Sequence, residues 1–258
     1  MRLRFLIGWI VPVLLLVVWE AAVRGHLLSS TLLPAPSAVA VAGWRLLRTG
    51  ELVDNISISF SRAMLGFLIG GGLGLGFGAA NGLSAFSRQL LDPSLQMVRN
   101  VPHLALIPLV ILWFGIGESA KLFLVALGVF FPIYINSYHG IRTADPQLVE
   151  MGRAYGMRGW RLFRRVILPG ALPSIFVGLR YGLGTMWLTL IVAETIASSD
   201  GIGHMAMQAR EFLQTDVVVL AILIYALLGK LADSAVRLLE HAYLPWHPNF
   251  QPAEGQAR

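Results

Sequence analysis

Long apolar runs, separated by short polar stretches, dominate the hydropathy pattern of this chain. A helix needs about 20 mainly apolar residues to cross the roughly 30 Å hydrocarbon core of a bilayer. Six stretches meet or approach this length, and the third is the shortest. They are Phe5–Val23, Met64–Leu83, His103–Phe114, Ala120–Tyr138, Phe176–Ala197 and Asp216–Val236. The pattern therefore predicts an all-α polytopic membrane protein with six transmembrane helices.

The composition supports a membrane protein and narrows the classes of chemistry. Of the 258 residues, 56% are apolar and 13% charged, and the mean hydropathy of +0.68 is too high for a water-exposed globule. The absence of cysteine excludes disulfides, cysteine-zinc sites and thiol nucleophiles. The net charge of +6 comes from arginines between apolar segments. Membrane lipids or an acidic protein surface explain such arginines better than nucleic acid does.

The first apolar stretch is compatible with a signal peptide or with an anchor helix. Arg2 and Arg4 precede it, as they would in either case. Trp19 and Glu20 stand where a signal peptide would carry small residues for cleavage, and five more spans follow. We therefore expect residues 5–23 to be a retained anchor.

The distribution of lysine and arginine predicts the orientation, because loops rich in these residues stay in the cytoplasm. Both termini and residues 142–173 are expected inside, and residues 200–215 outside. Residues 24–62 carry four arginines on the outside, but long loops weigh less in this rule. Within this loop, Leu33–Val39 ("LPAPSAV") predicts an extended turn that leads into a short surface helix, somewhere in residues 38–58.

The cytoplasmic segment around residues 150–173 is the most polar part of the chain and predicts a helix–turn–helix. Asp145 and Pro146 are typical of a helix start, and Gly156 can adopt the positive φ that ends a helix. Pro169 and Pro173 are expected to end the second helix. Apolar and small residues recur at helical spacing on one face of the first helix: Leu148, Met151, Gly152 and Tyr155. From the residues alone, this segment is either a docking element or a connector whose arginines reach lipid headgroups.

The same segment resembles the EAA motif of the permease subunits of bacterial ABC importers. Glu150 matches the acid of the motif, Gly156 its glycine, and Val166 with Leu168-Pro169 its aliphatic-x-Leu-Pro ending. Met151 and Gly152 stand where the family usually has alanines. The resemblance implies a coupling helix that docks into a cleft of an ATP-binding cassette ATPase subunit. It implies this role for Glu150, Met151, Gly152, Tyr155, Gly156, Val166, Leu168 and Pro169.

Longer stretches extend the resemblance from about Leu33 to Trp246, namely "VPHLALIPLVILWFGIGESAKLFLVALGVFFPIYINSYHGIR", "WLTLIVAETIASSDGIGHMAMQAREFLQTD" and "YALLGKLAD". They are similar to importer permeases for aliphatic sulfonates, taurine and nitrate. The resemblance implies one permease domain over residues 1–258 with the type I importer fold, a core at about 60–240 and a coupling loop at 142–173. It also implies a homodimer in the bacterial inner membrane, a periplasmic substrate-binding protein, and ATP used by the partner subunit with no cofactor bound by this chain. Aliphatic sulfonates or similar small organic anions are the expected substrates, with taurine, nitrate and another small solute left open.

Polar residues inside apolar spans are costly and therefore indicate candidate sites on the translocation pathway. They are Tyr134, Asn136, Thr189 and Glu194, with Arg180 near the inner end of the fifth span. Two structural alternatives remain. Glu194 can lie near the outer surface beside Ser198 and Asp200, and Thr189 can bond a carbonyl of its own helix.

Other patterns predict packing, or argue against further classes of protein. Glycines 66, 70, 74, 78 and 82 form a smooth ridge for close helix packing, either within the chain or across a dimer. Scattered histidines without an HExxH pattern argue against a metal site. Gly229-Lys230 is followed by Leu231 rather than Ser or Thr, so this chain is not expected to be its own ATPase. An ion-coupled secondary carrier would need paired buried carboxylates or repeated halves, and a membrane enzyme clustered catalytic groups.

Overall fold

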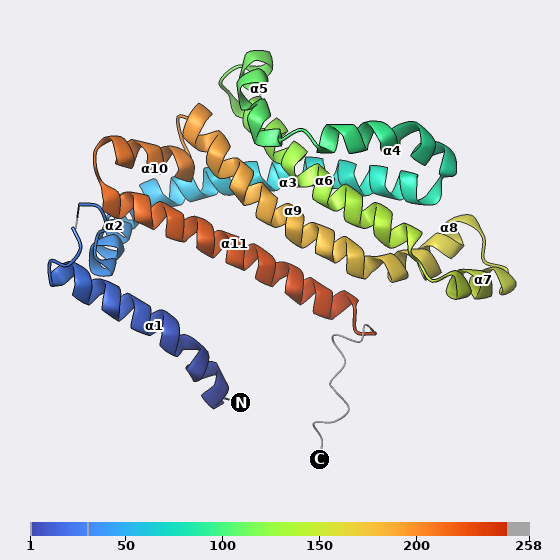
Figure 1. The fold of residues 1–258 in the computed structure, drawn as a ribbon, viewed down its shortest axis with the longest axis horizontal. Coiled ribbons are helices and arrows are strands. Elements are labelled where there is room, and N and C mark those ends of the chain that lie inside the picture. The colour runs from blue at the N-terminus through green and yellow to red at the C-terminus, as the bar shows by residue number, and fades with distance from the viewer. Residues whose placement is uncertain (1, 30, 247–258) are drawn as a thin grey trace. The chain divides into compact units, whose positions relative to one another are not determined.

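The computed structural model describes residues 2–29 and 31–246, and every regular element in these ranges is a helix (Figure 1). The predicted all-helical membrane fold is confirmed. The chain forms two compact units, one from Met1–Phe60 with Glu194–Leu227 and the other from Ser61–Ala193 with Leu228–Arg258.

The first unit contains α1 (Arg2–Arg24), α2 (Pro36–Thr49), α10 (Ile202–Glu211) and the adjoining parts of three longer helices. Helix α2 is the short helix expected after "LPAPSAV". Pro36 occupies its first turn, Gly50 ends it at a φ of +83°, and Val39, Ala42 and Leu46 are its buried face. Glu20 of α1 fixes the start of α2, because its carboxylate accepts hydrogen bonds from the Ser37 backbone N–H at 3.0 Å and hydroxyl at 2.8 Å.

The second unit contains most of the long helices and the polar insert. In chain order its elements are α3 (Glu51–Leu83, from Ser61 on), α4 (Ala85–Arg99), the 3-10 helix η1 (His103–Leu106), α5 (Ile107–Phe114), α6 (Glu118–Arg142), α7 (Pro146–Ala154), α8 (Gly159–Leu162), the π-helix η2 (Phe163–Ile167), α9 (Leu168–Ala197, to Ala193) and α11 (Thr215–Tyr243, from Leu228).

Four of the described helices are long and apolar enough to cross a membrane. They are Glu51–Leu83, Glu118–Arg142, Gly159–Ile196 and Thr215–Tyr243, and the pair Ala85–Arg99 with His103–Phe114 is a fifth if it is one broken span. The first predicted span coincides with α1, a helix of 23 residues. The total of six spans stays a prediction, as does the orientation.

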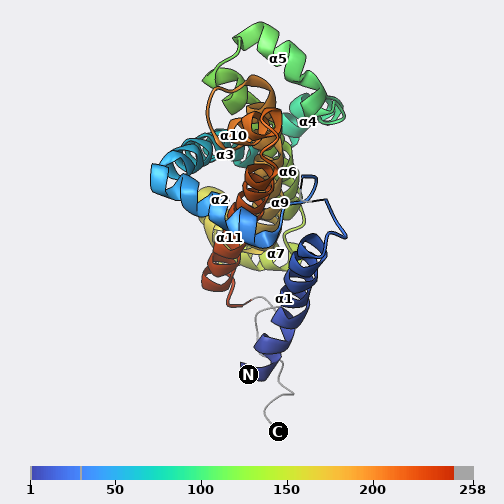
Figure 2. The ribbon, with the colours of Figure 1, turned by 90° about the vertical axis from the view of Figure 1, so that its left-hand side faces the viewer.

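The third predicted span is preceded by a helix that the hydropathy pattern did not indicate. The predicted spans leave residues 84–102 outside any helix, but Ala85–Arg99 is a helix, α4, and Ser84 caps its start by accepting the Ser87 N–H at 3.2 Å. Helix α4 and the following η1 and α5 are bent by 81° at the break, and the ribbon views show α5 turning away from α4 (Figure 1, Figure 2). Polar side chains on α4 lower its hydropathy, so an apolar window detects only the second half of the pair.

Pro169 and Pro173 do not end the second helix of the insert, which is a correction to the sequence-based expectation. Helical structure runs without a break from Gly159 to Ile196. Residues 163–167 are wound as a π-helix, and the Leu168 N–H donates to the Phe163 carbonyl five residues back. Pro169 has no N–H to donate, and its ring would clash with the preceding turn of a regular α-helix. The wider π-turn directly before Pro169 lets the helix continue.

The glycine ridge is a packing surface within the chain, where α3 meets α6. A Cβ atom on Gly74 would lie 2.7 Å from the Phe130 carbonyl oxygen, and one on Gly78 would lie 2.8 Å from Ser137 Cβ. A Cβ on Gly70 would collide with the Ala126 carbonyl. Helix α3 can approach the α6 backbone this closely only because these positions lack side chains.

Candidate functional site

The first helix of the insert, residues 142–173, begins and ends as its sequence predicts. The Asp145 side chain accepts the Gln147 N–H at 2.8 Å, and Pro146 follows at the first helical position. Gly156 has a φ of +75°. The Met157 N–H donates to the Gly152 carbonyl at 3.0 Å, and the Gly156 N–H to the Arg153 carbonyl at 2.9 Å. These two bonds form a Schellman motif, which requires the left-handed residue that Gly156 supplies.

Gly152 packs inside the insert rather than facing outward. A Cβ atom at this position would lie 2.8 Å from Leu162 Cδ1 and 3.2 Å from Val166 Cγ2. Its small size is therefore needed for α7 to pack on α8 and η2. The predicted apolar face of α7 is thus divided: Gly152 points inward, while Leu148, Met151 and Tyr155 are exposed by 47%, 51% and 77%. Trp160 of α8, 70% exposed, stacks near Phe163 and adds to the exposed apolar surface.

The end of the insert is anchored where α6 ends and α9 begins. Ile141 of α6 and Ala171 and Ile175 of α9 form a buried cluster, against which Ile167 and Leu168 pack. The residues of the motif-like pattern thus fall into two groups. Gly152, Gly156, Val166 and Leu168 shape and anchor the insert, whereas Glu150, Met151 and Tyr155 present exposed side chains.

Tyr134, a predicted pathway residue, joins three helices through its hydroxyl. The hydroxyl donates to Asp92 Oδ1 of α4 at 2.6 Å and accepts from Asn81 Nδ2 of α3 at 2.8 Å. Asn81 Oδ1 in turn accepts the Ser87 hydroxyl at 2.6 Å. Sequence reasoning missed Asn81 and Asp92, because polar residues near span ends are common and their partners are distant in sequence. The network fixes α4 beside α3 and α6.

Thr189 and Asn136 differ in their partners. Thr189 Oγ1 lies 3.1 Å from His103 Nε2 and so connects α9 to the start of η1. This bond is an alternative to the expected bond within its own helix. Asn136 Nδ2 donates to the Pro132 carbonyl of the same helix, four residues back, at 2.8 Å. Neither observation tests the predicted role in the pathway.

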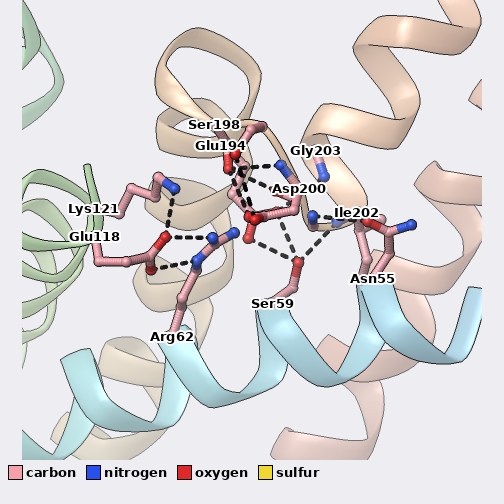
Figure 3. Close-up of polar contacts among 12 residues, drawn as sticks. Asn55, Ser59, Arg62, Glu118, Lys121, Glu194, Ser198, Asp200, Ile202 and Gly203 are labelled. Carbon is pink, nitrogen blue, oxygen red and sulfur yellow. Dashed lines mark hydrogen bonds and ion pairs between the residues drawn. The ribbon is translucent and has the colours of Figure 1, made fainter. Parts of the chain in front are cut away.

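Glu194 is buried among protein groups of the first unit, with 1% of the residue exposed. Its carboxylate accepts hydrogen bonds from the Ser59 hydroxyl at 2.8 Å and the Gly203 N–H at 3.0 Å (Figure 3). It also accepts the Tyr225 hydroxyl at 3.0 Å. Gly201 turns next to it with a φ of +97°, where a Cβ atom would lie 2.5 Å from Glu194 Oε1. The carboxylate thus organises the turn between α9 and α10.

Two further charge clusters lie in the second unit. Glu118, at the start of α6, accepts from Arg62 Nε at 2.7 Å and from Lys121 Nζ at 2.8 Å, and both cations are buried (Figure 3). Arg180 Nε of α9 donates to Asp233 Oδ1 of α11 at 3.1 Å beside a cavity of about 380 Å³. The sequence singled out Arg180 but not Asp233, because nothing in the order of residues pairs α9 with α11.

Among residues 2–29 and 31–246, no three His, Cys, Asp or Glu side chains gather at metal-binding distance.

Comparison with known proteins places this architecture. The profile of the family described as "Binding-protein-dependent transport system inner membrane component" matches residues 72–244. The chain is 61% identical over 246 residues to the Escherichia coli (strain K12) aliphatic sulfonates transport permease protein SsuC, covering 95% of this chain and 94% of that protein. It is 37% identical over 242 residues to the taurine transport system permease protein TauC of the same organism, covering 92% and 88%.

A solved structure supports the same fold. The crystal structure of an amino acid ABC transporter with histidines superposes with a TM-score of 0.63 at 18% identity, covering 77% of this chain and 96% of that chain. The likeness at this identity concerns the fold alone. Together with the profile match over more than half of the chain and the 61% identical relative, it shows that this chain belongs to the family of binding-protein-dependent transport system inner membrane components, as a transport subunit and not an enzyme.

Proposed function

We propose that this chain is the membrane-spanning permease of an ATP-driven importer for aliphatic sulfonates. The observation that carries the substrate is the 61% identity, over nearly the full length of both proteins, to a permease named for aliphatic sulfonates. Taurine, the substrate in the name of the 37% identical relative, is itself an aminoalkyl sulfonate. Both names point to a small organic anion with a sulfonate group.

The cytoplasmic insert is the proposed contact with the ATPase subunit. Its two helices are packed together at Gly152 and held to the span ends at Leu168. A force on α7 would therefore be transmitted to α9 through packed helices rather than through a flexible loop. Its exposed surface carries apolar side chains at Leu148, Met151 and Tyr155 next to Glu150. Exposed apolar side chains that cluster on a polar, cytoplasmic segment are typical of a protein interface. ATP would be hydrolysed by the partner, and arginines of the insert would also contact lipid headgroups.

The assembly we propose is a homodimer with two ATPase subunits inside and a substrate-binding protein outside. The pathway would run between the two copies, near Tyr134, Asn136, Thr189 and Glu194. The family description names transport that depends on a binding protein, which supports the outer partner. Helix α10 and the turn that Glu194 organises are expected at the outer surface, where such a partner would dock.

Reconstitution of the permease with its ATPase and binding protein in proteoliposomes tests the proposal. Radiolabelled ethanesulfonate, taurine and nitrate would be offered at equal concentrations on the side of the binding protein. ATP would be supplied on the side of the membrane that carries the ATPase. We expect ATP-dependent import of ethanesulfonate that exceeds import of nitrate. Preferential import of taurine would reassign the substrate, and import without ATP, driven by an ion gradient, would contradict the proposed mechanism.

A further inference from the structure

Helix α4 runs back along the membrane-spanning part of α3. An apolar cavity of about 400 Å³ is lined by Ile69 and Leu73 of α3 together with Leu95 and Val98 of α4. Because α4 follows α3 after a single residue, this pairing means that the two helices are antiparallel and that the end of α4 lies level with about residue 70. Fifteen residues at about 1.5 Å each carry α4 roughly 22 Å back from the end of α3. The break after Arg99 therefore lies within the span.

The contacts of His103 place the break at the same depth from two other helices. Its ring bonds Thr189 in α9, and a Cβ atom on Gly128 of α6 would lie 3.5 Å from His103 Cδ2. Gly128 is ten residues into α6, which starts at Glu118, so it too lies well inside a span. Residues 100–102 are thus irregular backbone at membrane depth. Such backbone occurs only where it is enclosed by protein or lines water.

Arg99, Asn100 and Val101 at this break are exposed. The side chains of Arg99 and of Arg88 make no hydrogen bond or ion pair with any residue in the described part of the chain. Arg88 and Arg99 are eleven residues apart, so they point in nearly the same direction along α4, about 16 Å from one another. Asp92 and Gln96 lie between them, and Asp92 is engaged by Tyr134 and Gln96. One side of α4 is therefore a polar stripe that ends in an unpaired guanidinium.

An unpaired arginine inside a bilayer does not face hydrocarbon, because the cost of burying its charge there is several kcal/mol. It faces water or an anion. Discontinuous helices inside membranes recur at the substrate sites of transporters for the same reason: they bring polar groups to the middle of the bilayer. In this chain the bend of 81° lies between Arg99 and His103, so Arg99, Asn100 and His103 stand at the break.

We infer that the break between α4 and η1 is an anion-binding point on the translocation pathway, with Arg99 as the residue that binds the sulfonate or other anionic group of the substrate. Arg88 attracts the anion onward along the stripe toward the inner end of α4. The inference rests on the proposed importer function and adds the residue that recognises charge. A planar guanidinium with several donors suits the oxygens of a tetrahedral anion.

The first test measures charge selectivity at the break and does not depend on transport. In this cysteine-free chain, Asn100→Cys would be assembled in the full complex and treated with 2-sulfonatoethyl methanethiosulfonate, an anionic alkyl sulfonate, or with its trimethylammonium analogue. Leu68→Cys, exposed on α3 at a similar depth, is the control for a lipid-facing position. We expect Asn100→Cys to react and Leu68→Cys not to react. Adding Arg99→Gln should lower the ratio of anionic to cationic reaction rates about tenfold.

The second test measures import. Arg99→Gln should reduce ethanesulfonate imported per ATP about tenfold, while hydrolysis stimulated by the binding protein persists, and Arg99→Lys should retain most import. Arg48→Gln, an exposed arginine of α2 that contacts Trp44, is the matched control and should import like wild type. The inference is overturned if Asn100→Cys is unreactive, if Arg99→Gln leaves the rate ratio unchanged, or if Arg99→Gln imports like wild type. A wild-type complex that hydrolyses ATP but imports no ethanesulfonate refutes the proposed substrate instead, and the rate ratio still decides the role of Arg99.

Discussion

Gly152 of α7 lies so close to Leu162 of α8 that a Cβ atom on residue 152 would stand 2.8 Å from the leucine Cδ1. The two helices of the insert therefore fold as one unit. Met151, the neighbouring residue, has 51% of its surface exposed. Substitutions at these adjacent positions separate two properties: the packing of the insert, which involves residue 152, and the proposed contact with the ATPase, which involves residue 151.

Met151→Glu is expected to weaken retention of the ATPase without unfolding the insert. Burying a methionine at an interface contributes about 1.5–3 kcal/mol, and a carboxylate there would lose this and add a desolvation cost. The measurement is the amount of ATPase that co-purifies with a permease present at wild-type level. Gly152→Leu is the comparison: it should make the arginine-rich insert sensitive to trypsin, whereas Met151→Glu should not. If Met151→Glu retains the ATPase at the wild-type level, α7 is not part of the interface.

Gly156→Val tests whether the turn of the insert transmits the motion. A φ of +75° is strained for a β-branched residue by about 1–3 kcal/mol. We expect normal membrane levels but loss of the ATP hydrolysis that loaded binding protein stimulates. Gly170→Ala in α9, where a Cβ meets nothing within 4 Å, is the control, and Arg164→Gln on the exposed side should also have little effect. Loss of transport in Arg164→Gln alone would indicate an electrostatic anchor.

Gly70→Ala should destabilise the second unit, because the new methyl group would collide with the Ala126 backbone carbonyl. Overpacking of this kind costs about 1–3 kcal/mol. Gly72→Ala, two residues on, meets nothing within 4 Å and should leave stability unchanged or raise it by up to about 1 kcal/mol. Thermal unfolding in detergent compares the two variants. Equal melting temperatures would mean that α3 and α6 are not in close contact.

Glu194→Gln should destabilise the turn between α9 and α10. An amide in place of the carboxylate presents a donor to groups that are themselves donors, such as the Gly203 N–H, and an unsatisfied buried group costs about 1–3 kcal/mol. Tyr225→Phe removes one of the bonds and should have a smaller effect. Melting temperature and transport are measured together. If Glu194→Gln keeps its melting temperature and loses transport, the carboxylate acts in the pathway, as the sequence predicted, rather than in the turn.

Single cysteines test the orientation. Gln147 and Ser199 are both exposed, the first in the insert and the second in the turn before α10. In intact inner-membrane vesicles with the outer face outward, an impermeant thiol reagent should label Ser199→Cys and spare Gln147→Cys. The reverse pattern would invert the orientation.

Local sequence signals predicted local features well. Asp145-Pro146, Gly156 and "LPAPSAV" each mark a helix end or start whose physics is contained in a few residues, and the structure confirms them. The ridge of glycines likewise predicted close packing, although only the structure identifies α6 as its partner.

Features that depend on distant residues were not accessible from the sequence. Helix α4 is too polar for a hydropathy window, and its position depends on Tyr134, 42 residues after Asp92. The carboxylate of Glu194 is satisfied by Ser59, 135 residues away, so its burial could not be read from its neighbours. The prolines at 169 and 173 were expected to end a helix, because sequence alone does not reveal that a π-turn precedes Pro169 and that α9 continues through Pro173.

The unbroken helix from Gly159 to Ile196 has a mechanical consequence. Its longer part, α9, has 30 residues and spans about 45 Å. Near its middle, Gly178 and Gly182 press α9 against α6, where a Cβ on Gly178 would lie 2.8 Å from Asn136 Cβ. If the proposed ATPase pushes on the insert, α9 would turn about this contact with α6, and Thr189, which lies beyond the contact, would move in the opposite direction. Because Thr189 bonds His103, this movement of α9 would displace the bend beside Arg99.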